Sequence, residues 1–386
     1  MNLDTAGDKI ACPTKMTVLE KTIQEIGPID QSWIEAAARR QLELTKPPGS
    51  LGRLEEIANR CAGIRESLEL TANHPRIVLF AADHGVCAEG VSAYPQEVTA
   101  QMVENFLRGG AAINALARAG GIELRVVDVG VATTIPSSIR QATRSPAPPA
   151  GTRNFCEEPA MTEGEMNAAM ETGIELARDA AAEGCDLLGF GEMGIGNTTS
   201  ASAIAAALTG QPVEAVIGRG TGADDACLAR KRSAIERGLA LHSDRLGGVP
   251  ARPGGRTRVR GPAPLACTTE ILRCVGGFEI AAMCGFCLGA ASRRIPVLTD
   301  GFIATAAAAL AVRLCPAVSG YLFAAHRSTE PGHAHLLELV GQEPLLDLRM
   351  RLGEGTGVAL AMKVMQAAIA AFTEMATFAS AGVSNK

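Results

Sequence analysis

Five short apolar segments divide the chain, and most of them end at Gly or Asp before a helix-like pattern begins. Continuous apolarity over this length is typical of strands that are buried on both faces. The predicted strands are Ile77–Ala82, Leu124–Val129, Asp186–Phe190, Ile295–Leu298 and Val318–Ala324. The helical patterns between them cover Thr99–Ala119, Thr162–Glu183, Thr198–Thr209 and Ala304–Leu314. This alternation predicts an α/β fold with a doubly wound, mainly parallel sheet flanked by helices, and ligand sites at the carboxyl ends of the strands.

The two ends of the chain show helical patterns without strands. The predicted helices are Asp30–Leu44, with Asp30 as the candidate N-cap, Arg53–Glu69, Leu345–Arg351 and Gly357–Phe378. Helical termini that flank an α/β core commonly pack together, so we expect residues 21–74 and 340–386 to form one small helical domain. The α/β core then spans residues 75–339, and residues 1–20 form an N-terminal extension.

One internal stretch has the composition of a loop. Residues 246–267 read LGGVPARPGGRTRVRGPAPLAC, which is rich in Pro, Gly and Arg. Such a sequence holds neither a helix nor a central strand. We therefore predict a basic surface loop at 246–267, inserted into the core.

Charge and composition narrow the classes of function. The 386 residues carry a net charge of -5 and only 3% aromatic residues. Proteins that bind nucleic acid usually present a basic surface or aromatic stacking platforms, so we expect no nucleic-acid partner. The chain is longer than one compact core usually requires, which agrees with a large domain plus a smaller one.

The cysteines and the apolar segments bear on the cellular compartment. The eleven cysteines form no metal-like cluster, and residues 1–17 are too mixed and charged for a secretion signal. Cysteines scattered in this way are typical of buried thiols in a reducing cytoplasm. Cys284 and Cys287 have redox-motif spacing, but they continue an apolar helical run, which favours a core position. Charges or glycines interrupt the apolar stretches before ~18 residues, so no membrane span is predicted.

The most informative segment is glycine-rich. A predicted buried strand runs into DLLGFGEMGIGNTTS at 186–200. Glycines let backbone N–H groups approach an anion, and the N-terminus of the following helix adds positive potential. Asn197 and Thr198 are expected to cap that helix. The segment matches neither a Walker loop nor a dinucleotide fingerprint. It predicts a phosphate site, although a tight strand-to-helix turn would also explain the glycines.

Polar residues follow three other predicted strands. Asp83 and His84 follow the first strand, Asp128 stands near the end of the second, and Asp300 follows the fourth. His84 could ligate a metal or act as a base, but a histidine there more often braces a loop through hydrogen bonds. The other five histidines lack zinc-ligand spacing. We therefore expect no metal and no cofactor.

A second candidate site precedes the last long helix. Here Glu354 stands between glycines in RLGEGTG at 351–357. Packing explains such a carboxylate poorly, because the glycines reduce the stability of the folded backbone. Glu354 is either a first-turn residue that favours the helix dipole, or a general base that the glycines expose to a ligand.

Several longer motifs occur in order between about Leu44 and Ala376. They read LTKPPGSLGRLEEIA, ADHGVCAEGVSAYPQEVTAQMV, GEMGIGNTTSAS, GRGTGADD, GGFEIAAMCG, LTDGFIATAAA and LGEGTGVALAM. Together these motifs resemble the nicotinate-nucleotide–dimethylbenzimidazole phosphoribosyltransferase family. Residues 1–20 and 246–267 depart from the shared pattern.

The resemblance implies a parallel α/β domain, a small domain from both termini and a homodimer. It implies that Glu354 is the catalytic base and that Lys231 lies near the phosphate of the nucleotide. Ser92, Tyr94 and Gln101 would line the benzimidazole pocket. The phosphate and ribose would bind at Gly191, Glu192, Gly194, Gly196, Asn197 and Thr198.

The implied reaction moves ribose 5-phosphate from nicotinate mononucleotide to 5,6-dimethylbenzimidazole, giving α-ribazole 5′-phosphate and nicotinate for the nucleotide loop of cobalamin. The nicotinate is a pyridinium, so it leaves without help from a metal. One benzimidazole nitrogen attacks the ribose while Glu354 accepts the proton of the other. Attack opposite to departure inverts the β-linkage to α, and Glu192 would steady positive charge on the ribose.

Other functions remain open at this stage. The same transfer could serve adenine or unsubstituted benzimidazole. A non-catalytic nucleotide-binding protein would keep the phosphate site without needing Glu354. A dehydrogenase with a dinucleotide fold would need G-x-G-x-x-G after the first strand, where the chain has Asp83-His84-Gly85 instead.

Overall fold

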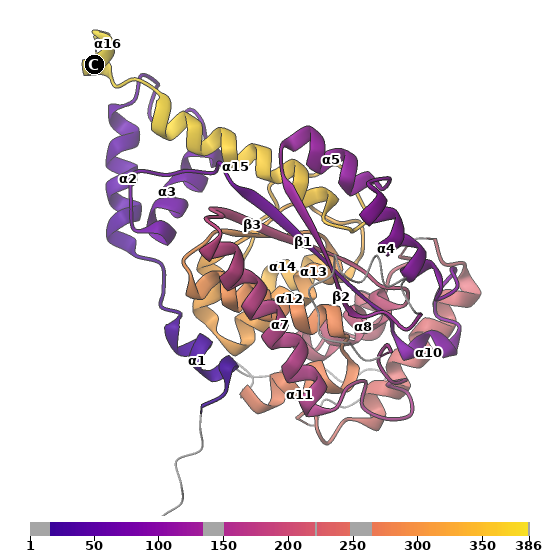
Figure 1. Ribbon diagram of the computed structural model, residues 1–386. Coiled ribbons are helices and arrows are strands. Elements are labelled where there is room, and N and C mark those ends of the chain that lie inside the picture. Colours follow the sequence, from indigo (N-terminus) through magenta and orange to yellow (C-terminus); the bar gives the residue numbers. More distant parts are fainter. Residues whose placement is uncertain (1–15, 134–149, 221, 248–264, 385–386) are drawn as a thin grey trace, which may run out of the picture.

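The predicted strands form one parallel sheet in the order β2-β1-β3-β4-β5 (Figure 1). The computed structural model describes residues 16–133, 150–220, 222–247 and 265–384. The strands are β1 Pro75–Ala82, β2 Glu123–Gly130, β3 Leu187–Met193, β4 Val297–Thr299 and β5 Leu322–Ala324. The strand that follows β1 in the chain, β2, lies on one side of β1, whereas β3, β4 and β5 lie on the other side. The sheet therefore has its topological switch point between β1 and β3. Ligands of such sheets bind beside the carboxyl ends of the strands.

Helices cover both faces of the sheet. The helices α5 (Ala112–Gly120) and α15 (Thr356–Glu374) lie side by side on one face, with α4 (Val98–Arg108) next to them. The other face is covered by α7 (Glu163–Ala182), α12 (Phe278–Ser292) and α13 (Phe302–Leu314). Every residue of β1 is buried, which explains its uninterrupted apolar sequence. The predicted fold class is confirmed.

Shorter elements complete the described chain. The helices of the core are α8 Asn197–Thr209, α9 Val213–Val216, α10 Asp225–Leu241, α11 Leu265–Val275 and α14 Gly332–Val340. Two 3₁₀ helices are η1 Gly85–Glu89 and η2 Pro316–Tyr321. The helices from the chain ends are α1 Val18–Glu25, α2 Gln31–Glu43, α3 Arg53–Arg65 and α16 Phe378–Ala381.

The small residues allow α7 and α12 to cross with their backbones in direct contact. A Cβ atom at Gly173 would lie 1.8 Å from the carbonyl oxygen of Ala282, and one at Gly285 would lie 1.9 Å from that of Met170. Cys284 and Cys287 are fully buried in α12. The sequence prediction that this pair belongs to the core, and not to a redox site, agrees with this burial.

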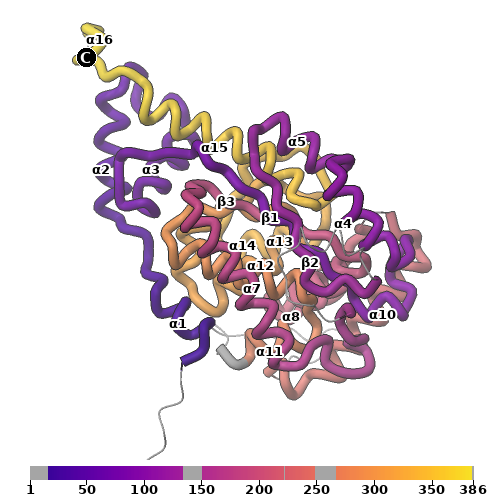
Figure 2. The backbone as a smooth tube through the Cα atoms, in the orientation of Figure 1, coloured from indigo at the N-terminus to yellow at the C-terminus, as the bar shows by residue number. Residues whose placement is uncertain are grey.

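The helices α2 and α3 lie beside the far end of the last long helix, α15, as Figure 2 shows. α3 packs against α2 and α15, and Leu44 forms an isolated bridge with Thr377. Arg60 of α3 donates to the carbonyl oxygens of Ser319 at 2.7 Å and Gly320 at 2.8 Å, which holds the terminal helices on the core. α1 begins at Val18, inside the predicted extension. The division at residues 21–74 and 340–386 stays a prediction.

Two predicted helices have different bounds in the structure. The pattern over Thr99–Ala119 forms two helices, because Gly109 leaves α4 with a φ of 79° in the left-handed region. The helix predicted over Arg53–Glu69 ends at Arg65, where Glu66 adopts a φ of 51°. As predicted, Asp30 caps α2 by accepting a hydrogen bond from the Ser32 N–H.

Two other predictions for the second half of the chain are wrong in part or in full. The first residues of Val318–Ala324 belong to η2, which Pro316 starts, so β5 is only three residues long. Leu345–Arg351 is not helical, because the N–H groups of Leu345 and Leu346 bond to carbonyls of Ala324 and Ala325. This segment extends along β5 instead.

α15 is long and apolar enough to cross a membrane by length and composition alone, which the sequence analysis did not anticipate. In the structure it packs against α3, α5 and strands β1, β3 and β4. Its apolar face is therefore buried in the protein, as expected for a core helix.

The predicted loop at 246–267 lies mostly outside the described residues. Its described ends are structured: Leu246 is buried and α11 already begins at Leu265. The ends also meet, since the Cys267 thiol lies 3.4 Å from the Leu246 carbonyl oxygen.

A deletion of residues 248–264, closed by a short Gly-Ser link, is therefore expected to retain activity and thermal stability. Because the two ends of the gap are already adjacent, joining them with a short link changes the conformational entropy of the chain only slightly. Melting curves and specific activity of the deleted protein check this. Insoluble or inactive protein would show that the segment supports the core.

Candidate active site

A pocket of about 790 Å³ opens at the carboxyl ends of the strands. Its walls come from six parts of the chain. These are residues 91–102 after β1, the end of β3 with the start of α8, residues 219–231, and the segments after β4 and β5 with residues 350–354. The pocket therefore lies where the parallel sheet predicts it, beside the switch point between β1 and β3.

The turn from β3 into α8 forms the floor of the pocket. Gly196 is the N-cap residue, with a φ of 95° and no side-chain cap. The prediction that Asn197 and Thr198 cap this helix is wrong. Asn197 instead donates to the buried carboxylate of Glu192, and Thr198 accepts from Lys231. Gly194 also lines the pocket, and a Cβ atom there would lie 2.5 Å from the Ala82 carbonyl oxygen.

Lys231 brings a buried positive charge to this floor. Its side chain comes from α10, and the residue is only 1% exposed. The ammonium donates to Thr198 Oγ1 at 2.8 Å and to the Gly218 carbonyl oxygen at 3.2 Å. No carboxylate of the described residues lies within ion-pair distance of it. Burial lowers the pKa of Lys231 to about 8. An anion bound at this point would supply the missing negative charge.

Glu354 also lines the pocket, and its backbone conformation is unusual. Gly353, Glu354 and Gly355 have consecutive φ values of 87°, 64° and 81°. Glycine adopts this left-handed region without strain, whereas a glutamate there is strained and needs support from its surroundings. Gly353 and Gly355 therefore allow the left-handed backbone conformation that presents Glu354.

Gly191 also serves this arrangement. A Cβ atom on Gly191 would lie 2.1 Å from the Gly355 nitrogen and 2.4 Å from the Glu354 carbonyl carbon. The backbone of β3 thus touches the backbone of the Glu354 turn. Of the predicted phosphate and ribose residues, Gly191 is the one that lies outside the pocket lining.

Two of the pocket glutamates, Glu192 and Glu354, have raised pKa values. Burial is the main cause for both, because it disfavours the charged form. It raises the pKa of Glu192 to about 8, with further contributions from the charges of Glu279 and Asp300. Burial and the charge of Asp300 raise the pKa of Glu354 to about 7. Both groups therefore titrate near neutral pH, the range in which a general base works best.

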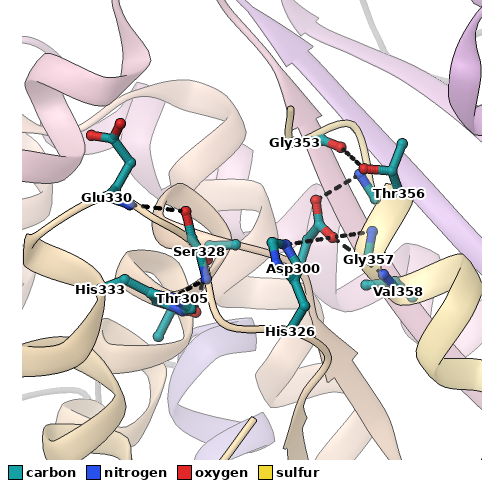
Figure 3. A network of polar contacts seen from close by, with 12 residues as sticks. Asp300, Thr305, His326, Ser328, Glu330, His333, Gly353, Thr356, Gly357 and Val358 are labelled. Carbon is teal, nitrogen blue, oxygen red and sulfur yellow. Dashed lines mark hydrogen bonds and ion pairs between the residues drawn. The ribbon is translucent and has the colours of Figure 1, made fainter. Parts of the chain in front are cut away.

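The turn that carries Glu354 is tied to the sheet by Asp300, the residue after β4 (Figure 3). Its carboxylate accepts hydrogen bonds from the backbone N–H groups of Gly355, Gly357 and Val358 at 3.0, 2.8 and 3.2 Å. His326, the second residue after the end of β5, lies beside it. Of the four strand-end residues predicted from sequence, Asp300 is the one whose side chain holds the Glu354 turn.

The predicted base-binding residues are only partly brought together. Ser92 and Tyr94 line the pocket, where the Ser92 hydroxyl accepts from the Tyr94 N–H at 3.1 Å. Tyr94 is 49% exposed at the rim. Gln101 lies on an exposed face of α4, and its neighbour Met102 lines the pocket instead.

Asp83, His84 and Asp128 have structural contacts outside the pocket lining. His84 bonds to Glu279 Oε1 at 2.6 Å and to Ser200 Oγ at 3.0 Å, and it is fully buried. This agrees with a histidine that braces the fold. Asp83 accepts from the N–H of Ala132, and Asp128 from those of Gly130 and Val131.

The sequence analysis missed several polar pocket residues. These are Arg219, Glu330, His326, Ser328 and Arg351. Glu330 accepts from the Gly220 N–H at 3.0 Å, and Arg351 donates to the Gly220 carbonyl oxygen at 3.1 Å. The GRGTGADD motif at 218–225 was the available signal, because its glycines permit this close approach. Among the residues that the structure describes, no group of three or more His, Cys, Asp or Glu side chains is arranged to hold a metal ion.

Comparisons with known proteins agree with this architecture. A family model described as a phosphoribosyltransferase matches residues 26–383, which makes the chain a phosphoribosyltransferase. A nicotinate-nucleotide–dimethylbenzimidazole phosphoribosyltransferase from Chloroflexus aggregans is 52% identical over 373 residues, covering 96% of this chain and 99% of the relative. The chain belongs to the nicotinate-nucleotide–dimethylbenzimidazole phosphoribosyltransferase family, and the resemblance seen in the motifs is confirmed.

Further relatives extend the match. An enzyme of the same name from Geobacter metallireducens is 49% identical over 368 residues, with 95% of this chain and 98% of the relative covered. A solved structure of the enzyme of that name from Thermus thermophilus has a TM-score of 0.79 and 44% identity, and it covers 93% of this chain and 100% of its own.

Proposed function

We propose that the chain transfers ribose 5-phosphate from nicotinate mononucleotide to 5,6-dimethylbenzimidazole, in the synthesis of the lower ligand of cobalamin. The observation that carries this proposal is one pocket with two opposed chemical groups. Lys231 brings to this pocket a buried ammonium that forms no ion pair among the described residues, and Glu354 brings a carboxyl group. The first suits the phosphate of a nucleotide, and the second suits proton transfer from an attacking ring nitrogen.

The phosphate is proposed to bind at the start of α8. The helix dipole contributes positive potential there, and the helix N-terminus has no side-chain cap. Lys231 and Thr198 would donate to the phosphate oxygens. The ribose would then lie over Gly194 and Glu192, between the floor and the Glu354 wall.

Glu354 is the proposed general base. As a benzimidazole nitrogen bonds to ribose C1, the pyridinium leaves with the electrons of its C–N bond and becomes neutral. The second benzimidazole nitrogen then loses its proton to Glu354. Positioning of both rings on opposite faces of the ribose supplies proximity, and the product has the α configuration.

Glu192 is proposed to stabilise positive charge on the ribose. Its carboxyl group is buried beside the start of α8 and held by Asn197. Bond breaking ahead of bond formation leaves positive charge on the ribose ring, and the ionised form of Glu192 would lower the energy of that state. Because its pKa is raised to about 8, this ionised form is expected to increase as the pH rises through that value.

A panel of acceptor bases tests the proposal. Purified protein would be incubated with nicotinate mononucleotide and dimethylbenzimidazole, benzimidazole or adenine, and the products identified by mass spectrometry. We expect the highest kcat/KM for dimethylbenzimidazole. A higher value for adenine would assign a different acceptor to the same site, and nucleotide binding without any turnover would point to a non-catalytic protein.

The enzyme is expected to need no divalent metal. The pyridinium is already an activated leaving group, so no metal is required to polarise it. Activity after extensive treatment with EDTA should equal that of untreated enzyme. Loss of activity that Mg²⁺ restores would contradict this prediction.

We also propose that the protein is a cytoplasmic homodimer without a nucleic-acid or membrane partner. The described cysteines are free thiols, as a reducing compartment favours. Light scattering of the purified protein should give twice the chain mass of 39.9 kDa. A monomer at micromolar concentration would refute the dimer.

A further inference from the structure

The strained backbone at Glu354 needs a device that holds it, and the structure contains one. The N-cap of α15 is Gly355, which has no side chain to cap its own helix. Asp300 takes that role from the end of β4. Its Oδ2 accepts from the Gly355 N–H, and its Oδ1 accepts from the N–H groups of Gly357 and Val358. The turn that presents Glu354 is thus fixed to the central sheet and not merely to its own helix.

His326 completes this contact from the next strand. Its Nε2 lies 3.6 Å from Asp300 Oδ1, and neither ring nitrogen has a hydrogen-bond partner among the described residues. The ring occupies space that only glycine leaves open, since a Cβ atom at Gly357 would lie 2.0 Å from His326 Cδ2. A buried imidazole with this single acidic neighbour is placed to compensate the charge of Asp300.

Few charged groups surround Glu354, and each belongs to an identified element of the fold. Asp300 acts on it from the position after β4, Glu192 belongs to β3, and Glu279, whose charge acts on Glu192, belongs to α12. His326 faces Asp300 from the segment after β5. Burial raises the pKa of Asp300, whereas His326 and the three N–H groups lower it. The negative charge of Asp300 in turn favours the protonated form of Glu354.

We infer that Asp300 is the positioning residue of Glu354 and that His326, whose ring packs against the Asp300 carboxylate, is the partner of Asp300. Asp300 holds the left-handed turn in place through three backbone hydrogen bonds, and its charge makes Glu354 a stronger base. The charge of His326 acts on Asp300 in the opposite sense and limits that effect. The inference rests on the proposed function of Glu354 as general base.

Substitutions at Asp300 and His326 are expected to shift the pH profile of kcat in opposite directions. Asp300→Asn keeps the shape of the side chain. An NH₂ group in place of Oδ2 cannot accept a hydrogen bond, so the Gly355 N–H loses its acceptor. We expect kcat to fall roughly 10–100-fold, the scale on which a small misplacement of a reacting group acts. We also expect the acid limb of the kcat profile to move to lower pH, because a negative charge beside Glu354 is removed. His326→Gln leaves Asp300 uncompensated and should move the same limb to higher pH.

Asp128→Asn is the matched control. Asp128 also lies near the carboxyl end of a strand, β2, and accepts two backbone N–H bonds, from Gly130 and Val131, away from the pocket. Its pH profile should coincide with that of the wild type. Binding of nicotinate mononucleotide, measured by calorimetry, should change little in all three variants.

The opposite shifts separate a positioning role from ordinary structural support. An acid limb that stays in place in both Asp300→Asn and His326→Gln overturns the inference, even where kcat falls. If Asp300→Asn does not fold, the shift in His326→Gln alone decides. Glu354→Gln, assayed in parallel, tests the underlying function: wild-type activity in that variant overturns the proposed base, whereas an inactive Glu354→Gln with unshifted Asp300 and His326 variants overturns only the present inference.

Discussion

Glu354→Gln is expected to lower kcat by ~10²-fold or more while the protein stays folded, because a positioned general base contributes about that much. Glutamine keeps the size of the side chain but cannot accept the benzimidazole proton. The binding of nicotinate mononucleotide should persist, since its phosphate contacts lie elsewhere in the pocket. Steady-state kinetics and calorimetry of the purified variant measure both. A kcat near that of the wild type would remove Glu354 from the mechanism.

The stability of the same variant provides an internal check. A carboxyl group with a raised folded-state pKa holds its proton more tightly in the folded chain than in the unfolded chain. Its contribution to the free energy of unfolding is therefore lost as the pH rises from the ordinary pKa of 4.5 through the folded value of about 7. Glu354→Gln should melt at a higher temperature than the wild type at pH 8, and at nearly the same temperature at pH 4.5.

Lys231→Met is expected to weaken the binding of nicotinate mononucleotide by roughly 10–150-fold, the effect of losing a charge-assisted hydrogen bond of about 1.5–3 kcal/mol. Methionine fills the same buried space without a charge, so the fold should tolerate it. The affinity for dimethylbenzimidazole alone should change much less. Calorimetry with each substrate separates the two.

Lys363→Met is the matched control, because Lys363 is an exposed lysine of α15 whose ammonium contacts only Gln366 among the described residues. It should bind both substrates like the wild type. Gly196 is less suitable for this test. A Cβ atom there would lie 2.6 Å from Cys87 Sγ at a φ of 95°, so a substitution would disturb the fold and the phosphate site together.

The sequence predicts the sheet well because its strands are buried on both faces. β1 is the clearest example, with every residue buried and an uninterrupted apolar pattern. The errors arise where contacts between distant segments outweigh local preference. Leu345 and Leu346 extend along β5 because their N–H groups find carbonyl partners there, although the pattern of Leu345–Arg351 favours a helix.

The candidate site shows the same division. Motifs with several glycines led to the prediction of Glu354, Glu192 and Thr198. Glycine is favoured where a backbone turns sharply or lies close to another group, so its position in the sequence indicates such places. Sequence could not reveal that Gly191 faces Gly355, or that Gln101 points away from the pocket. His326 and Arg351 were missed because single polar residues carry no local pattern, and only the fold brings them to the pocket.

The most direct measurement of the central claim is a time course by proton NMR of enzyme, nicotinate mononucleotide and dimethylbenzimidazole. The account predicts that each nicotinate released matches one α-linked ribazole 5′-phosphate formed, and that Glu354→Gln slows both signals together. A β-linked product, free ribose 5-phosphate in place of a new nucleotide, or no release of nicotinate would contradict it.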